Sequence, residues 1–390
     1  MNLENYYFSG RLFRKIERFV RNYRTEERLS YRYNDCVAKF RERLELNNLP
    51  IESCAPGEEE YIRFWSQFSN RVEPYSYRYF YRLVGENPHI IPEDIADAII
   101  EAKLNPTVYR RFYSDKNAYS QYISPHSILP KTFLCRIEGG GILAADFARP
   151  IVNGNELDWN ISAKDVACFI GDYDKIVLKP SQDSHSGQGV MLFEKENGRY
   201  VSKDGQVLDG HFLREYNCNF VLQEVLKQHD FMARFCKSSV NTFRVMTYRS
   251  VEDENIYIMG SVLRIGREGS FVDNLFAGGG FVCVNVESGT LHQRVFDQYG
   301  RVGNTINNVD FSKEIIQIPF WNCIVDTAKS IARQNPHCRL LAMDLMYDID
   351  GNVRFIESNV DGFNWSFCMY AGGIPFGEKF DEVINYCSKK

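Results

Sequence analysis

Two apolar runs near the C-terminal end of the sequence flank a turn-forming segment, and they restrict how this part of the chain can fold. Residues 340–347 read LLAMDLMY, residues 353–359 read VRFIESN, and DIDGN lies between them. Apolar runs of this length around a short segment with Asp and Gly predict two antiparallel strands joined by a tight turn. Alternate side chains of a strand share a face, so Glu357 and Asn359 are expected to point the same way.

Acidic and amide side chains stand where buried strands would be apolar. If Asp344 pairs with Glu357 across the hairpin, the loop runs from Ile349 to Asn352, a common hairpin length. Asp344, Glu357 and Asn359 then converge on one face. Three oxygen ligands on rigid strands suit Mg²⁺, which keeps several waters and usually shares its site with nucleotide phosphates. The hairpin therefore predicts a magnesium site.

Two other interpretations of the hairpin stay open at this point. One is an exposed hairpin whose polar residues face water. The other is a calcium loop, because Asp348, Asp350, Gly351 and Glu357 fall at its third, fifth, sixth and twelfth positions. Its first position, however, is Met346, and the flanking residues are typical of strands rather than helices.

Residues 175–194, KIVLKPSQDSHSGQGVMLFE, predict a strand, a Gly/Ser-rich loop and a second strand. Lys179 ends the first apolar run, where an ammonium group is costly unless an anion meets it. The loop from Ser181 to Gly189 supplies backbone N–H groups, hydroxyls and glycines that permit close approach to a polyphosphate. Four of its residues are candidate phosphate contacts: Ser184, Ser186, Gly187 and Gly189. An ordinary hairpin turn has a similar composition, and the order of residues does not fit a P-loop.

A strand that ends at 223–226 offers a place for a nucleotide base. The stretch 219–230 reads NFVLQEVLKQHD, and its Gln-Glu-Val-Leu segment can give an adenine ring backbone hydrogen bonds and apolar contacts. A plain amphipathic strand is the alternative interpretation.

The N-terminal third is expected to be helical. Between residues 11 and 46 an amphipathic helix is predicted, followed by a second one. The apolar residues of the first helix are Leu12, Phe13, Ile16, Phe19, Val20 and Tyr23. Arginines between them make the segment basic, so it either packs on the body of the protein or lies on a membrane surface. Residues 50–60 predict a loop, and 92–104 predict a further helix that starts with a proline.

Short β-rich runs punctuated by glycine begin at about residue 131, and a helix is predicted at 320–334. The expected fold class is α+β with a helical N-terminal part. A length of 390 residues suggests two or three units. We place their boundaries at 1–110, 111–226 and 227–390.

Composition excludes several function classes. A formal charge of −5 gives no electrostatic basis for binding nucleic acid. The eleven cysteines form no Cys-x-x-Cys pair, so we expect neither a zinc site nor a disulfide framework. Their pattern predicts reduced cysteines in a cytoplasmic protein. The sequence shows no signal peptide and no apolar run long enough to predict a membrane span.

The order of these elements resembles the ATP-grasp superfamily: a lysine with a glycine flap, a Gln-Glu hinge strand, then Asp followed by Glu-x-Asn. Residues 239–248, 261–289 and 318–351 are similar to sugar-transfer-associated ATP-grasp proteins, and the similarity extends over about 115–375. Residues 264–279 are also similar to a segment of ribosomal-protein glutamate ligases. The resemblance implies an ATP-grasp fold, in which two α+β subdomains grip ATP, with residues 1–110 as a divergent helical replacement of the first family domain.

The resemblance also implies roles for the residues already singled out. Lys179 would hold the α- and β-phosphates under the flap. Adenine would be read by Glu224, next to Gln223, and by the backbone of Val225 and Leu226, with Asp230 as a ribose ligand. Relatives place a further phosphate-binding lysine ahead of the flap, for which Lys116 and Lys131 are the two candidates. The residues expected at the γ-phosphate and acyl phosphate are Arg244, Arg264 and Asn274, and those expected on Mg²⁺ are Asp344, Glu357 and Asn359.

The function that the resemblance implies is an ATP- and Mg²⁺-dependent carboxylate–amine ligase. It would form an amide through an acyl phosphate, on a sugar or a cell-surface polysaccharide precursor. Two alternatives stay open: an ATP-grasp kinase acting on a hydroxyl, and a non-catalytic nucleotide-binding partner of a glycosyltransferase. The sequence does not choose the carboxylate, the amine or the oligomeric state.

Overall fold

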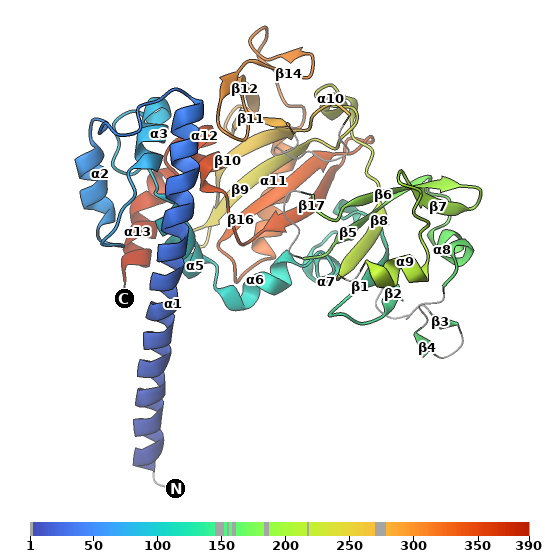
Figure 1. Ribbon diagram of the computed structural model, residues 1–390, viewed down its shortest axis with the longest axis horizontal. Coiled ribbons are helices and arrows are strands. Elements are labelled where there is room, and N and C mark those ends of the chain that lie inside the picture. The colour runs from blue at the N-terminus through green and yellow to red at the C-terminus, as the bar shows by residue number, and fades with distance from the viewer. Residues whose placement is uncertain are drawn as a thin grey trace.

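The computed structural model contains two antiparallel sheets and a group of helices that packs against the larger sheet (Figure 1). The structure describes residues 3–144, 152–153, 156–157, 161–182, 187–216, 218–269 and 278–389, without the side chains of 3–24, 152–153 and 156–157.

The smaller sheet has six strands in the order β2-β1-β8-β5-β6-β7. Its strands are β1 (Thr132–Arg136), β2 (Ile142–Ala144), β5 (Lys175–Pro180), β6 (Met191–Glu196), β7 (Arg199–Ser202) and β8 (Phe220–Glu224). Helices α8 (Ala163–Ile170) and α9 (Gly210–Glu215) share a hydrophobic core with it. Ser162 and Asp165 form a capping box that starts α8.

The larger sheet has seven strands in the order β13-β12-β11-β10-β9-β16-β17. Its strands are β9 (Thr242–Arg249), β10 (Ile256–Ile265), β11 (Gly280–Asn285), β12 (Thr290–Phe296), β13 (Val302–Gly303), β16 (Leu340–Tyr347) and β17 (Val353–Asn359). Every residue of β16 is buried, because α11 (Trp321–Arg333) contacts the sheet on one face and α12 (Trp365–Gly372) with the N-terminal helices covers the other. Burial on both faces explains why this strand, apart from Asp344, is apolar without alternation.

The remaining elements are short apart from the first helix. The helices are α1 (Leu3–Leu46), α2 (Glu58–Trp65), α3 (Tyr75–Val84), α4 (Glu93–Ile95), the π-helical turn η1 (Ala96–Ile100), α5 (Glu101–Leu104), α6 (Thr107–Ser114), α7 (Tyr119–Tyr122), η2 (His126–Ile128), α10 (Asp230–Ala233), η4 (Gly377–Lys379) and α13 (Phe380–Ser388). Two small hairpins pair β3 (Val152–Asn153) with β4 (Glu156–Leu157), and β14 (Thr305–Ile306) with β15 (Val309–Asp310).

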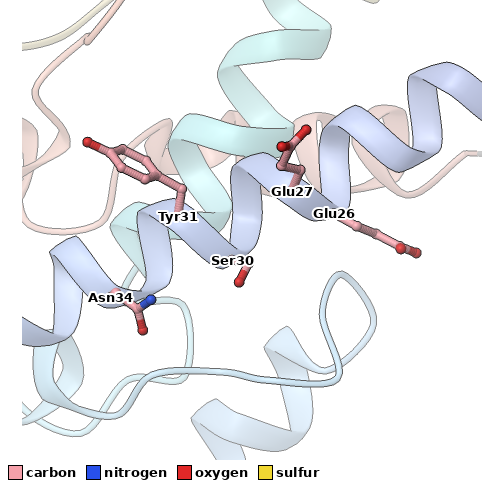
Figure 2. Close-up of a pocket in the computed structure, with 5 residues that line it drawn as sticks. All are labelled: Glu26, Glu27, Ser30, Tyr31 and Asn34. Carbon is pink, nitrogen blue, oxygen red and sulfur yellow. The ribbon is translucent and has the colours of Figure 1, made fainter.

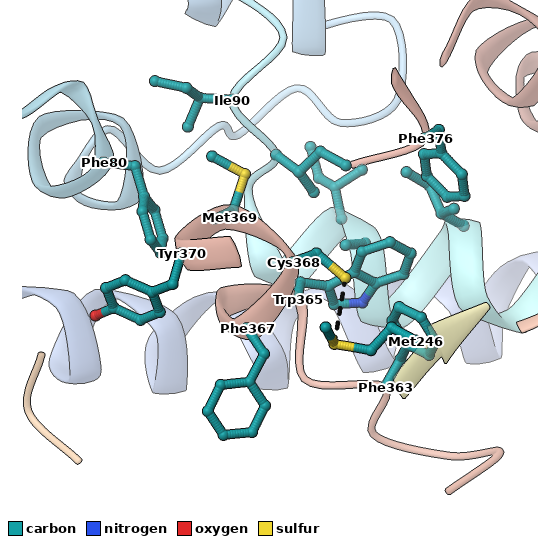
Figure 3. Close-up of a cluster of buried hydrophobic side chains, with 14 of the residues drawn as sticks. Phe80, Ile90, Met246, Phe363, Trp365, Phe367, Cys368, Met369, Tyr370 and Phe376 are labelled. Carbon is teal, nitrogen blue, oxygen red and sulfur yellow. Dashed lines mark hydrogen bonds between the residues drawn. The ribbon is translucent and has the colours of Figure 1, made fainter. Parts of the chain in front are cut away.

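One hydrophobic cluster joins the N-terminal helices to the C-terminal helices and to the larger sheet. Figure 3 shows Phe80 and Ile90 from the N-terminal part beside Met369 and Tyr370 of α12, with Met246 of β9 below. The division of the chain at residues 110 and 226 stays a prediction. The buried side chains of the first predicted unit nevertheless share their core with those of the third.

The predicted α+β class with a helical N-terminal part is confirmed, and the first strand begins at Thr132, as the β-rich runs from about residue 131 predicted. The expectation of two helices between residues 11 and 46 was wrong, because α1 is continuous from Leu3 to Leu46. Its C-terminal half packs on the body through Cys36, Phe40 and Leu44, and its N-terminal half extends away from it (Figure 1). Across the described residues, no helix is at once long and apolar enough to cross a membrane.

Substitution of Phe40 by Ala tests whether the N-terminal helices belong to the main core. Phe40 has no exposed surface and contacts the rings of Tyr79 and Phe80. We expect Phe40→Ala to lower the free energy of unfolding by about 3–5 kcal/mol, because it leaves a cavity, in urea unfolding followed by circular dichroism. Val108→Ala, at a position 76% exposed, is the control and should change it by less than about 0.5 kcal/mol. A Phe40 effect as small as the control's would contradict the shared core.

Candidate functional site

The hairpin of β16 and β17 is paired as predicted at Asp344, but its loop runs from Asp348 to Asn352 and not from Ile349, because Tyr347 pairs with Val353. Asp344 pairs with Glu357, and Asn359 pairs with Ala342. A bulge between Asp344 and Leu345 makes Ile356 the extra residue of β17. The pairing of Asp344 with Glu357 is therefore confirmed, and the convergence of the Asp344, Glu357 and Asn359 side chains on a metal ion stays a prediction.

The calcium-loop interpretation of this hairpin was wrong. Its flanks are strands, and the Asp348 carboxylate accepts hydrogen bonds from the backbone N–H groups of Asp350 and Asn352, at 3.1 and 2.8 Å. Gly351 adopts a left-handed conformation with φ of 80°, which closes the turn. Asp348 thus holds the turn, and Asp350 is exposed at its tip.

Two arginines hold the carboxylate of Asp344. Arg244, which is opposite Asp344 on β9, donates two hydrogen bonds to it, each of 2.7 Å. Arg264 of β10 donates a third, of 2.8 Å. Asp344 is only 2% exposed, so this ion triple is well desolvated. An ionised carboxylate offers about four acceptor positions, and Asp344 keeps one of them, on Oδ1.

Glu357 is held by a lysine from the other side of the site. The Lys116 ammonium lies 3.1 Å from Glu357 Oε2, and the Lys116 N–H donates to the carbonyl of Ser181, just after β5. Burial favours the protonated form of Glu357, but the charges of Lys116, Arg244 and Lys179 outweigh it and lower its pKa to about 2. Glu357 is therefore a carboxylate at neutral pH.

Lys179 lies at the end of β5, close enough to Lys116 for the two charges to interact. Burial lowers the pKa of Lys179 to about 8, and Lys116 adds to this effect while Glu357 opposes it. Burial acts against the charge of Lys116 as well, but Glu357 outweighs it and raises the pKa of Lys116. Both lysines thus carry a positive charge at neutral pH.

We call these six charged residues the cationic cluster: Lys116, Lys179, Arg244, Arg264, Asp344 and Glu357. It contains four cations and two anions, so it has an excess of positive charge in a poorly hydrated place. A cluster with this charge attracts a polyanion, for example a nucleoside triphosphate.

A cavity of about 420 Å³ adjoins the cationic cluster at Lys116. Residues from both sheets line it, among them Lys131, Gln223 and Glu224 from the smaller sheet or its flanks and Arg354 and Ile356 from β17. Lys131 is exposed, with its ammonium 5.0 Å from the ring centre of Tyr173. Both candidate lysines line the cavity, and Lys116 in addition forms the ion pair with Glu357.

A second hollow, of about 410 Å³, lies along α1 and is far simpler. Figure 2 shows its lining, which comes from one helix alone: Glu26, Glu27, Ser30, Tyr31 and Asn34. Two of these residues are acidic and none is basic, so this hollow does not suit a phosphate.

The predicted hinge, residues 223–226, contributes the polar side chains of Gln223 and Glu224 to the lining of the cavity. Glu224 accepts hydrogen bonds from the Lys131 N–H, at 2.9 Å, and from Arg354, at 2.7 Å. Gln223 donates to Thr132, and its side-chain oxygen is buried without a partner among the described residues. No described hydrogen bond uses the backbone groups of Val225 or Leu226. Neither Val225 nor Leu226 is among the residues that line the cavity, to which this segment contributes Gln223 and Glu224.

The other predicted site residues are placed as follows. Gly187 and Gly189 both adopt a left-handed conformation, and the Tyr216 hydroxyl donates to the carbonyl of Gly189. Asp230 opens α10, is exposed, and is not among the residues that line the cavity. Asn359 is half-buried and donates to the carbonyl of Ala342. Three predicted residues lie outside the described part of the chain: Ser184, Ser186 and Asn274.

The predicted magnesium ligands fit only a metal that brings further ligands. Within the described ranges, no three His, Cys, Asp or Glu side chains gather closely enough to hold a metal ion. The predicted set consists of two carboxylates and one amide, and three of the four acceptor positions of Asp344 are already used. Mg²⁺ with its waters and phosphate oxygens suits such an incomplete set.

Sequence reasoning missed Arg354. This residue joins the hinge to the hairpin, since it donates to Glu224 and to the carbonyl of Leu129 and lies 3.3 Å from Asp348. An arginine within the apolar strand VRFIE was the only available signal.

A family model described as sugar-transfer associated ATP-grasp matches residues 98–375. The chain belongs to this family. The predicted ATP-grasp fold is thereby confirmed, and the matched region starts earlier than the resemblance had suggested, at the π-helical turn. The comparison with curated proteins finds no match.

Solved structures with a similar trace include three enzymes. An L-amino acid ligase from Bacillus licheniformis is 12% identical, with 71% of this chain and 48% of that chain covered and a TM-score of 0.38. An N5-carboxyaminoimidazole ribonucleotide synthetase in complex with ADP is 11% identical, with 64% and 45% covered and a TM-score of 0.35. D-alanyl-alanine synthetase A from Vibrio cholerae is 12% identical, with 71% and 65% covered and a TM-score of 0.38. The chain spans about half the length of the first two. Scores this low carry no argument, so the assignment rests on the family match.

The charge coupling within the cationic cluster can be tested at Lys179. We expect Lys116→Met to raise the pKa of Lys179 above its value of about 8, because a neighbouring positive charge is removed. Lys131→Met is the matched control and should leave that pKa unchanged, since Lys131 does not contribute to it. NMR titration of lysine side-chain signals measures both. An unchanged Lys179 titration in Lys116→Met would contradict the cluster.

Proposed function

We propose that this protein is an ATP- and Mg²⁺-dependent ligase that joins a carboxylate to an amine. The observation that carries the proposal is the cationic cluster at the edge of a cavity, built from both sheets inside the region that matches the ATP-grasp family. A cavity that is lined by polar groups and joined to the cationic cluster at Lys116 suits a nucleotide.

The cavity would hold adenine, and the cationic cluster would hold the phosphates. The backbone groups of Val225 and Leu226, which directly follow the lining residue Glu224, would bond the edge of the ring. The unpaired buried oxygen of Gln223 suits the exocyclic amino group of adenine, because an acceptor left without a donor in a buried place is costly. Lys116 and Lys179 would contact the phosphates, under the flap that ends at Gly189.

Mg²⁺ would be held by Glu357, Asn359 and the remaining acceptor position of Asp344. Bound there with phosphate oxygens, it would neutralise negative charge and orient the triphosphate. Arg244 and Arg264 would keep Asp344 in position, and their charges would also face the phosphate end of the site.

In the proposed reaction, a carboxylate oxygen of the substrate attacks the γ-phosphorus of ATP, and the bond to the bridging oxygen breaks. ADP leaves, and an acyl phosphate remains. An amine then attacks the acyl carbon, the phosphate leaves with the bonding electrons, and the amine loses a proton to give an amide. The chain's own contribution is to position two anions and to offset their repulsion with the four cations of the cluster.

The substrates belong to the proposal as well. The family description, sugar-transfer associated, supports an acid or amine carried on a sugar or on a cell-surface polysaccharide precursor.

Phosphate release from ATP should require a carboxylate and an amine together. Glu357→Gln should lower the rate at least about a hundredfold, because it removes a charge that acts on the metal and on Lys116. Asp350→Asn, at an exposed acid of the same hairpin, is the matched control and should stay within about twofold of the unchanged protein. A coupled phosphate assay over a panel of sugar acids and amines measures the rate of phosphate release. Mass spectrometry then identifies the products by their masses.

Three outcomes would contradict the ligase. A stable phosphoester product would indicate a kinase. Nucleotide binding without turnover across the panel would favour a non-catalytic partner. Equal activity of Glu357→Gln and Asp350→Asn would place the chemistry elsewhere.

The affinity for a non-hydrolysable ATP analogue should fall as the pH rises above about 8. Phosphate binds the protonated form of Lys179, whose pKa is about 8 before binding. Each pH unit above that value should therefore weaken binding of the analogue by up to tenfold. This range ends at about pH 9.5, where ordinary lysines begin to titrate. Lys179→Arg should remove this dependence, because arginine stays charged. Calorimetry at several pH values measures it, and an equally steep fall in Lys179→Arg would show that another group is responsible.

A further inference from the structure

The N-terminal half of α1 stands apart from the rest of the molecule. At 1.5 Å per residue, the 44 residues of this helix span about 66 Å. Its C-terminal half is buried through Phe40 and Leu44 and contacts α3, α4 and η1. The half that begins at Leu3 extends beyond every other described element, as the blue helix in Figure 1 shows.

The sequence of this half places apolar and basic residues on opposite faces. At about 100° per residue, one stripe about 120° wide contains all six apolar positions between residues 11 and 24. These positions are Leu12, Phe13, Ile16, Phe19, Val20 and Tyr23. The remaining arc contains all the basic positions: Arg11, Arg14, Lys15, Arg18, Arg21 and Arg24.

Charge is segregated between this segment and the rest of the chain. Residues 3–24 contain six basic and two acidic residues, whereas the rest contains 40 basic and 49 acidic residues. The basic character ends where Glu26 and Glu27 line the hollow of Figure 2. A basic face beside an apolar face is complementary to a surface that presents anionic groups over an apolar layer.

The apolar stripe is too short for a coiled coil with a second copy. Leu12, Ile16, Phe19 and Tyr23 follow heptad spacing, but the next positions in the series are Glu26 and Ser30, and those before it are Ser9 and Asn5. Two heptads fall short of the three or four that a coiled coil needs. Pairing two such helices in parallel would also bring like charges together.

We propose that residues 11–24 of α1 dock this protein on an anionic lipid surface. The helix lies in the plane of the interface, with its apolar stripe among the lipid chains and its arginines at the headgroups. The body, which carries the opposite net charge, stays off the surface at the other end of α1. This inference is independent of the proposed ligase activity.

The test is co-sedimentation of the full chain with vesicles. Vesicles made of equal parts phosphatidylserine and phosphatidylcholine should bind it, and phosphatidylcholine alone should bind it at least about tenfold more weakly. Two variants should each weaken binding to the anionic vesicles at least about tenfold. The first is a double variant of the apolar stripe, Ile16→Glu and Phe19→Glu. The second is a triple variant of the basic face, Arg14→Glu, Arg18→Glu and Arg21→Glu.

A matched control separates the segment from net charge. Lys164, Arg199 and Lys203 are exposed on the smaller sheet and its helix, so their replacement by Glu makes the same charge change on the body. This triple variant should bind like the unchanged protein. Circular dichroism should show equal melting temperatures for all forms, and nucleotide binding without vesicles should not change, whether or not the chain proves to be a ligase.

Three results would overturn the inference. The first is no sedimentation with anionic vesicles. The second is an equal loss of binding in the control triple, which would indicate attraction to net charge alone. The third is an oligomer in vesicle-free buffer that the α1 variants dissociate, which would show that the stripe binds a second copy of this chain.

Discussion

The ion triple of Asp344 with Arg244 and Arg264 is the interaction on which the site depends. Three neighbouring strands, β10, β9 and β16, supply one charge each, in a place that water hardly reaches. Removing one partner of such a buried group costs about 3–5 kcal/mol, since it leaves an uncompensated charge. The sheet therefore fixes two guanidinium groups beside the position of Glu357, and the positive excess of the cluster follows.

Two further ion pairs connect the sheets across the site. Lys116 reaches Glu357, and Arg354 reaches Glu224. Each pair joins a residue of β17 to a residue in or beside the smaller sheet. The cavity lies between these two connections, so a ligand that enters it contacts both parts of the fold at once.

Much of this could be predicted because strands impose strict alternation and register. The pairing of Asp344 with Glu357 was assumed from two strands around a turn and is present, although the bulge in β17 makes the loop one residue longer than predicted. The position of Lys179 followed from its apolar strand. Other features depend on contacts between segments far apart in the sequence. The residues next to Lys116 and Lys131 in the sequence do not show which lysine reaches Glu357. The role of Arg354 is recognised only from its ion pair with Glu224, which is distant in the sequence. The length of α1 was missed because its apolar stripe ends at Tyr23, while packing of Phe40 and Leu44 continues the helix.

The most direct test of the account is a crystal structure with a non-hydrolysable ATP analogue and Mg²⁺. We predict adenine in the cavity against Val225 and Leu226, phosphate oxygens within hydrogen-bond distance of Lys116 and Lys179, and Mg²⁺ on Glu357 and Asn359. A nucleotide bound elsewhere, or phosphates that contact neither lysine, would contradict the account.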